Sequence, residues 1–315
     1  MAKLIDVARA AGVSAASASR ALNGGQAVSP ELRRRVESAA ARLAYRPNVS
    51  AQVLASGAKR IAVVSARLID PVIAGVSESV ARALINLGHG ATIISAPIDD
   101  GAWLRGFVPS GVVFVGLFPA PSQLQPIAGV PWLAVADEPS EIGLCLELGL
   151  AGGWELACRY LSTEGHRRIG LLDTSTKVSA AMLSLRLNHE ALSLKDIRVE
   201  MPDVAPALRQ AFELVDRPTA LVCSSDAMAL AALRYCAIER IAVPQEVSII
   251  GFGDALFARY SYPALSSVRV PTEAISAASA KAILELLLGR SPVLSSPQPR
   301  LVIRESSGPV VSRGA

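Results

Sequence analysis

Hydrophobic residues recur at two different spacings along this 315-residue chain. Over the first 45 residues they return every three or four positions, as in short amphipathic helices. After residue 60, apolar runs such as GVVFVG (111–116) and RIGLLD (168–173) alternate with stretches of helical spacing. Continuous Val/Ile-rich strands between helices favour a parallel, doubly wound sheet. The pattern predicts a small all-α head followed by a larger α/β body.

The head begins with two short helices around a tight turn. The first ends at Gly12, and its apolar positions are Ile5, Val7, Ala8 and Ala11. Ser14 is the expected N-cap of a second helix, which runs to Leu22 and ends at Asn23 before two glycines. Two helices joined by a short glycine-bearing turn predict a helix-turn-helix.

A third helix is expected to begin at Ser29-Pro30-Glu31, where Ser29 caps and Pro30 occupies the first turn. Its predicted buried stripe consists of Leu32, Val36, Ala39, Ala40 and Leu43. The side expected to be exposed carries Arg33, Arg34, Arg35 and Arg42. The alternative for these helices is a small bundle with a structural role only.

Positive charge is concentrated in this head. Residues 1–60 hold ten Lys/Arg against three acidic side chains, a net charge of +7, and the remaining residues carry −3. Such asymmetry indicates a polyanionic partner, although charge alone also fits a solvated basic face. The thin second helix favours duplex DNA. Ala15, Ala16 and Ser17 let its backbone approach the major groove, and Arg20 reaches a base or a phosphate.

The segment NVSAQVLASG (48–57) places Val49, Val53 and Leu54 on one face of a two-turn helix. A helix of two turns is too short to be stable alone in water. We expect it to fold only on a partner.

The body shows two successive series of strands and helices, which predict two lobes with a cleft between them. The expected strands are residues 61–66, 91–96, 111–116, 131–136, 168–173, 197–201, 219–224 and 247–252. The expected helices are residues 72–87, 101–106, 122–128, 151–164, 179–193, 204–215 and 226–238.

Other signals are weak or missing. The start MAKLIDVA has no secretory pattern, and the uncharged stretch 107–136 contains five prolines, so we expect a cytoplasmic protein with no membrane segment. Its four cysteines have no paired spacing and its three histidines are scattered, so the cysteines are interpreted as core residues. No metal or other cofactor is expected.

The segment DVARAAGVSAASASRALNGGQAVSPELRRRVESAAARLAYRPN (6–48) resembles the DNA-binding head of the lac repressor (LacI/GalR) family of transcription regulators. The resemblance implies that Ala15, Ala16 and Arg20 read bases. It also implies that 48–57 is the hinge helix, whose Leu54 wedges open a base step from the minor groove. The expected DNA-contacting set is Ser14, Ala15, Ala16, Ser17, Arg20, Asn23, Tyr45, Asn48 and Leu54.

The body is similar to the same family at EGHRRIGLLD (164–173), PTALVCSSDAMALAALR (218–234), IAVPQEVSIIGFGD (241–254) and YPALSSVRVP (262–271). These segments imply a two-lobed, periplasmic-binding-protein-like domain that dimerises and responds to a small effector. The candidate effector-binding residues are Arg67, Asp70, Ile73, Ser184, Arg186, Ser225, Gly253 and Asp254.

Several of these positions depart from a sugar-binding pattern, because small or apolar residues replace polar ones. Arg67 and Arg186 favour an anionic effector if either faces the cleft, and the alternative is that the response to an effector has been lost. The boundaries expected are a head at 1–47, a hinge helix and linker at 48–59, and a two-lobed domain at 60–315.

The resulting hypothesis is a homodimeric transcription regulator, expected to be a repressor, that binds a pseudo-palindromic operator of double-stranded DNA. Two alternatives share the body's pattern: a periplasmic-type solute-binding protein and an α/β nucleotide-dependent enzyme. GFGDAL (251–256) holds only two glycines of the dinucleotide fingerprint, and no catalytic triad is apparent. A periplasmic solute-binding protein needs an export signal and has no need of a basic head. The basic head therefore argues against both the solute-binding protein and the enzyme.

Overall fold

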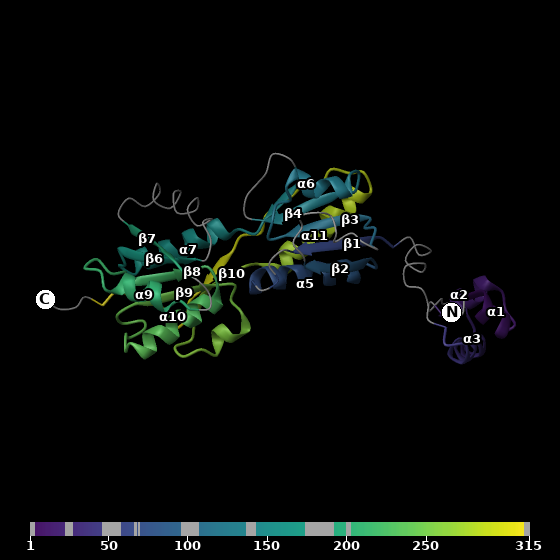
Figure 1. The fold of residues 1–315 in the computed structure, drawn as a ribbon, viewed down its shortest axis with the longest axis horizontal. Helices are drawn as coiled ribbons and strands as arrows, with labels where there is room; N and C mark the ends of the chain where they lie inside the picture. The colour runs from purple at the N-terminus through teal and green to yellow at the C-terminus, as the bar shows by residue number, and fades with distance from the viewer. Residues whose placement is uncertain are drawn as a thin grey trace. The chain divides into compact units, whose positions relative to one another are not determined.

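The chain forms two compact units, residues 1–59 and 60–315 (Figure 1). The computed structural model describes residues 4–22, 28–45, 58–65, 68, 70–95, 107–136, 143–173, 192–199 and 203–311.

The first unit contains three helices, α1 (Leu4–Ala10), α2 (Ala15–Leu22) and α3 (Pro30–Arg42). Their shared core is made almost entirely of small side chains, namely Val7, Ala8, Ala11, Ala18, Ala21, Val36, Ala39 and Ala40. Small residues let the helices approach closely, and Gly12 turns the chain between α1 and α2 at a φ of +63°. The predicted helix-turn-helix and third helix are confirmed.

Two apolar residues of the head differ from the expected pattern. Leu43 was expected in the buried stripe of α3 but is exposed, because that helix ends at Arg42 and Leu43 is its C-cap. Ile5 was expected among the apolar positions of the first helix but is 57% exposed.

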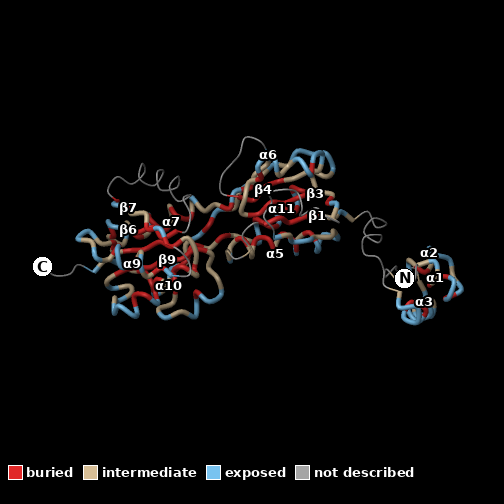
Figure 2. Tube along the Cα trace, in the orientation of Figure 1, coloured by how far each residue is buried: buried red, intermediate tan, exposed pale blue. Residues whose placement is uncertain are grey.

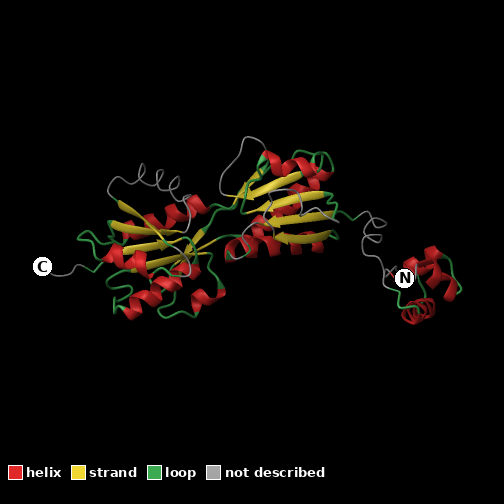
Figure 3. Ribbon diagram, in the orientation of Figure 1, coloured by secondary structure: helices red, strands yellow, loops and turns green. Residues whose placement is uncertain are grey.

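The second unit contains two sheets (Figure 3). In the first sheet all strands are parallel, in the order β2-β1-β3-β4-β5. Its strands are β1 (Arg60–Ser65), β2 (Gly90–Ser95), β3 (Gly111–Val115), β4 (Trp132–Ala136) and β5 (Cys145–Glu147). Its helical segments are α5 (Pro71–Asn86), α6 (Pro121–Leu124), the 3-10 turn η2 (Gln125–Ile127) and α11 (Thr272–Leu287).

The second sheet has the order β11-β10-β9-β8-β6-β7 and is parallel except for the antiparallel pair β10 and β11. Its strands are β6 (Arg168–Asp173), β7 (Ser193–Arg198), β8 (Ala220–Cys223), β9 (Ser248–Phe252), β10 (Ser266–Arg269) and β11 (Arg300–Val302). Its helices are α7 (Leu150–Thr163), α9 (Ala205–Phe212), α10 (Asp226–Ile238) and the 3-10 turn η3 (Leu256–Arg259).

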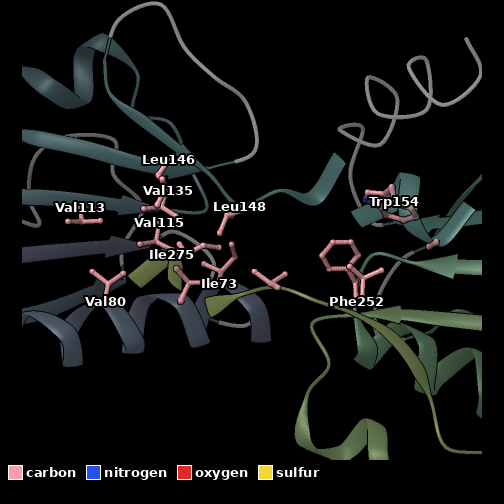
Figure 4. Close-up of a cluster of buried hydrophobic side chains, with 14 of the residues drawn as sticks. Ile73, Val80, Val113, Val115, Val135, Leu146, Leu148, Trp154, Phe252 and Ile275 are labelled. Carbon is pink, nitrogen blue, oxygen red and sulfur yellow. The ribbon is translucent and has the colours of Figure 1, made fainter. Parts of the chain in front are cut away.

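The buried residues lie mainly along the strands of both sheets and on the helices that cover them (Figure 2). In the first sheet, α5 and α11 pack on one face, and on the other face Phe114 packs edge-to-face with Trp132. In the second sheet, α7 covers one face and α9 and α10 cover the other. One hydrophobic cluster extends from Ile73 in α5 to Trp154 and Phe252 beside the second sheet (Figure 4).

Several predicted elements are corrected by the structure. The strand expected at residues 91–96 is present as β2, one residue earlier, at the edge of its sheet and partly exposed. The helix predicted to reach residue 193 cannot do so, because Ser193 begins β7, and the strand expected at 197–201 begins four residues earlier. The expected helix at 101–106 lies outside the described residues. The long helix α11 was not predicted.

The uncharged stretch 107–136 forms β3, α6, η2 and β4, as expected from its prolines. Within the part of the chain that the structure describes, no helix has the length and apolarity needed to cross a bilayer. Cys158, Cys223 and Cys236 are buried as predicted, whereas Cys145 is half-buried.

Candidate nucleic-acid interface and effector site

The N-terminal end of α2 presents a surface of small polar and apolar side chains. Ser14, Ala15 and Ala16 are exposed, Ser17 is half-buried, and the backbone N–H of Ser17 donates to Ser14 Oγ at 3.0 Å. Ser14 is therefore the N-cap that the sequence predicts. With no large side chain in its first turn, the helix can bring its backbone close to another surface.

Arg20 lies one turn further along α2 and is exposed. Its Nε–H donates to the carbonyl oxygen of Ala16 at 3.3 Å, which folds the side chain back over the helix. The guanidinium group forms no ion pair with any described residue, so it is available to a negatively charged or hydrogen-bonding partner.

The third helix adds exposed positive charge to the head. Arg34, Arg35 and Arg42 are exposed on α3, whereas Arg33 is half-buried. Ser29 caps the helix by accepting from the N–H of Leu32 at 3.3 Å. In α1, the closest approach of Arg9 to Asp6 is 4.0 Å, and both side chains are substantially exposed. The ion pair therefore contributes little to stability, and most of the positive charge of Arg9 is not neutralised by it.

The remaining expected DNA contacts are placed as follows. Tyr45 is half-buried and packs against the core of the head, so part of its ring serves the fold. Asn23, Asn48 and Leu54 lie outside the described residues.

The candidate effector residues that the structure describes lie at the carboxyl ends of strands or at helix starts, as expected for open α/β sheets. Asp70 caps α5 and accepts from the N–H groups of Val72 at 2.9 Å and Ile73 at 3.3 Å. Ser225 caps α10 and accepts from Met228 N–H at 3.2 Å. The side chain of Ile73 belongs to the hydrophobic core and is 3% exposed. Arg67, Ser184 and Arg186 lie outside the described residues.

Asp254 is the centre of a buried ion-pair network. Its carboxylate is 1% exposed and forms ion pairs with Arg269 and Arg304. The N–H of Asp254 donates to Ser267 Oγ at 2.9 Å, and Ser267 Oγ–H donates to Asp226 Oδ1 at 2.6 Å. Ser267 thus links the carboxylate of Asp226 to the backbone of Asp254.

Burial raises the pKa of Asp226 above its usual range, and its hydrogen bonds from Ser267 and the Ala255 N–H act against this rise. Asp254 was expected from the sequence as a site residue, but its neighbours Asp226, Ser267, Arg269 and Arg304 were not. Arg304 lies 50 residues from its partner, and no local pattern links the two.

Gly253 occupies a tight position. Its φ is +119°, and a Cβ at this residue would lie 3.0 Å from Val72 Cγ2 and 3.5 Å from Asp226 Oδ2. The side chain of Val72 therefore fills the space that a side chain at position 253 would need. The polar groups described in this region are engaged in caps and ion pairs.

The three buried cysteines, Cys158, Cys223 and Cys236, are not reactive thiols. Burial raises the pKa of Cys158 and Cys236 to about 12 and raises that of Cys223 further. Thiols with such pKa values stay protonated at neutral pH and are poor nucleophiles. Within the described ranges, no group of three or more His, Cys, Asp or Glu side chains is arranged to hold a metal ion.

Two family models match the chain. "Bacterial regulatory proteins, lacI family" matches residues 3–48, and "Periplasmic binding protein-like domain" matches residues 158–307. The transcriptional regulator GalR of Salmonella typhimurium (strain LT2) is 30% identical over 306 residues, which cover 91% of this chain and 90% of GalR.

Two solved structures are similar along nearly the whole chain. A complex of the regulator CelR with cellobiose has a TM-score of 0.67 at 26% identity and covers 97% of this chain and 100% of its own. A lac repressor dimer bound to operator and the anti-inducer ONPF has a TM-score of 0.75 at 23% identity, covering 97% and 98%. The expected fold class, a helical head with a two-lobed periplasmic-binding-protein-like domain, is confirmed.

Proposed function

Because this chain belongs to the lacI family of bacterial regulatory proteins, we propose that it binds a pseudo-palindromic operator as a homodimer and represses transcription there. Members of this family are DNA-binding transcriptional regulators rather than enzymes, so the nucleotide-dependent enzyme is no longer an alternative. The helical head likewise argues against a periplasmic solute-binding protein.

The observation that carries the proposal is the exposed start of α2. The major groove of B-DNA is about 12 Å wide, so a helix with small side chains can lie deep within it. Ala15 and Ala16 then contact base edges directly, and Arg20 is long enough to donate to a guanine. The exposed arginines of α3 and Arg9 supply the cations that neutralise phosphates.

Dimerisation would place two heads on two half-sites about one helical turn of DNA apart or a multiple of it, which requires an operator with approximate two-fold symmetry. Residues 48–59 are proposed as the hinge helix and linker. On that assignment Leu54 of each subunit enters the minor groove at the operator centre, where the cost of unstacking is offset by the protein surface that bent DNA contacts.

The proposal is tested by selecting genomic DNA fragments with the purified full-length protein. We expect recovery of a small set of duplexes that share an inverted repeat, with an affinity that falls steeply as salt rises. Recovery without any shared sequence at low salt, or no retention of duplex DNA, would contradict it.

The wedge role of Leu54 requires a separate comparison. Leu54→Ala should reduce operator bending and should weaken binding to the recovered operator much more than binding to random duplex. Equal losses on the two DNAs would show that Leu54 does not act at the operator centre.

We infer that the effector is not a neutral sugar. Sugar recognition needs several free donors and acceptors, but Asp70 and Ser225 cap helices, Asp254 is fully ion-paired, and Val72 stands beside Gly253. The two remaining possibilities are an anionic effector and a regulator whose response has been lost. A thermal-shift screen of sugars, sugar phosphates and organic acids tests this inference, and a strong shift with a neutral sugar alone would refute it.

A further inference from the structure

A hollow of about 490 Å³ lies at the junction of β10, the start of α11 and the segment leading into β11. Three arginines line it: Arg259 from η3, Arg269 from the end of β10, and Arg300 from the start of β11. Thr272 and Gln298 add polar groups. The effector candidates Gly253 and Asp254 also line it, so the hollow adjoins the effector site that the family resemblance implies, but none of the three arginines is among those implied positions.

Positive charge around this hollow exceeds the negative charge available to balance it. Arg269 pairs with Asp254, but the same carboxylate also pairs with Arg304, so two cations share one anion. Arg259 and Arg300 are exposed and form no ion pair with any described residue. The other acidic side chain that lines the hollow, Glu273, is exposed and cannot neutralise both.

The hollow also receives the first turn of α11, a 16-residue helix. Thr272, Glu273 and Ala274 line it, and Pro271 at the N-cap position provides no side-chain hydrogen bond to the first turn. The N–H of Thr272 donates to the carbonyl oxygen of Val270 at 2.8 Å, and the positive end of the helix dipole adds to the positive potential of the arginines. Arginine guanidinium groups bind phosphate and carboxylate through paired hydrogen bonds.

We propose that this hollow binds a small organic polyanion whose phosphate or carboxylate groups contact Arg259, Arg269 and Arg300. Arg259 and Arg269 belong to the second sheet and its loops, whereas α11 packs with α5 on the first sheet. A polyanion held at this junction would therefore fix the start of α11 against the second sheet. This regulatory consequence rests on the proposed function, because it would act on the operator affinity of the full chain.

Anion binding is measured by isothermal titration of the full-length protein with inorganic pyrophosphate and with citrate, which represent the phosphate and carboxylate classes. The double variant Arg259→Gln/Arg300→Gln removes two exposed cations, and Arg290→Gln removes an exposed arginine just beyond the opposite end of α11. We expect saturable binding of at least one probe, weakened about tenfold or more in the double variant but unchanged in Arg290→Gln. No binding of either probe, or equal weakening in both variants, would overturn the proposal.

The regulatory consequence is read from operator affinity at constant ionic strength. Pyrophosphate or citrate, whichever binds, should change the operator Kd of the wild type and of Arg290→Gln but not that of the double variant. If the anion binds but the operator Kd does not change, the regulatory consequence alone is overturned. Loss of operator binding in every protein, with anion binding retained, overturns the proposed function and leaves the anion site standing.

Discussion

His166 joins three separate parts of the second lobe through its ring. It is buried, with Nδ1 3.0 Å from Thr219 Oγ1 and Nε2 3.0 Å from the carbonyl oxygen of Gly308. Because a carbonyl oxygen only accepts, Nε2–H is the donor to Gly308, and the neutral ring leaves Nδ1 as an acceptor. One side chain thus connects α7 and β6 to β8 and to the C-terminal segment.

Burial lowers the pKa of His166 from its usual 6.5, while the Gly308 carbonyl and Glu164 oppose this effect. The unfolded chain therefore takes up the proton at a higher pH than the folded one, and stability is lost as pH falls below about 6.5. We predict that the melting temperature drops between pH 7.5 and 5.5, and that His166→Gln has a smaller drop. His89→Gln is the control and should show the same drop in melting temperature as the wild type. If the drop becomes smaller by the same amount in both variants, the role of His166 is contradicted.

Single-residue predictions succeeded where the interaction is local. Ser14 and Ser29 accept hydrogen bonds from N–H groups three residues ahead, so the cap is written in a few consecutive residues. Asp254 is different, because its partners are 15 and 50 residues away and meet it only after the second sheet has formed. From the sequence, the carboxylate of Asp254 could therefore be predicted as an effector contact, but its ion pairs with Arg269 and Arg304 could not be predicted.

At the scale of elements, strong hydrophobic periodicity was sufficient to predict a helix or strand from the sequence, whereas weak periodicity was not. The predicted helix 226–238 matches α10, and β3 and β4 match their apolar runs. α11 was missed because its buried serines, Ser276 and Ser279, interrupt the apolar stripe and donate to backbone carbonyls inside the helix. β7 was misplaced because its sequence SLKDIR looks polar while only Leu194 and Ile197 are buried.

Two adjacent glycines in α7 should respond oppositely to the same substitution. A Cβ at Gly153 would lie 2.6 Å from the Phe252 ring, whereas a Cβ at Gly152 would meet only Gln298 and Pro299, at 3.6 and 3.9 Å. We predict that Gly153→Ala destabilises the protein by about 1–3 kcal/mol through overpacking. Gly152→Ala should stabilise it by about 0.5–1 kcal/mol through helix propensity.

Urea denaturation of the full-length variants measures both effects. Because the two positions share one helix, any general intolerance of α7 to alanine would appear in both variants. Equal destabilisation would show that helix geometry, rather than the contact between Gly153 and Phe252, determines the outcome.

At the scale of the whole molecule, the two-lobed architecture could be predicted from the alternation of strands and helices, but the surfaces that bind partners could not. A short segment around η3 exposes Leu256, Phe257, Tyr260 and Tyr262, the last by 96%. Four large apolar or aromatic residues within seven positions are typical of an interface rather than of solvent-facing chain.

We predict that this segment contributes to the proposed homodimer. The double variant Tyr260→Arg/Tyr262→Arg should raise the dimer dissociation constant about tenfold or more, measured by sedimentation equilibrium. Leu288→Arg, at an exposed position just after α11, is the control. If the double variant stays as dimeric as the wild type, the dimer forms through other residues.

The central claim is that the exposed start of α2 reads the base sequence of duplex DNA. The most direct test compares Arg20→Ala with Arg42→Ala on the selected operator and on random duplex at one salt concentration. We predict that Arg20→Ala lowers operator affinity by about 1–3 kcal/mol and relaxes preference at one base position of each half-site, while Arg42→Ala weakens both DNAs alike. If Arg20→Ala also weakens both DNAs equally and leaves the base preference intact, α2 is not the reading helix.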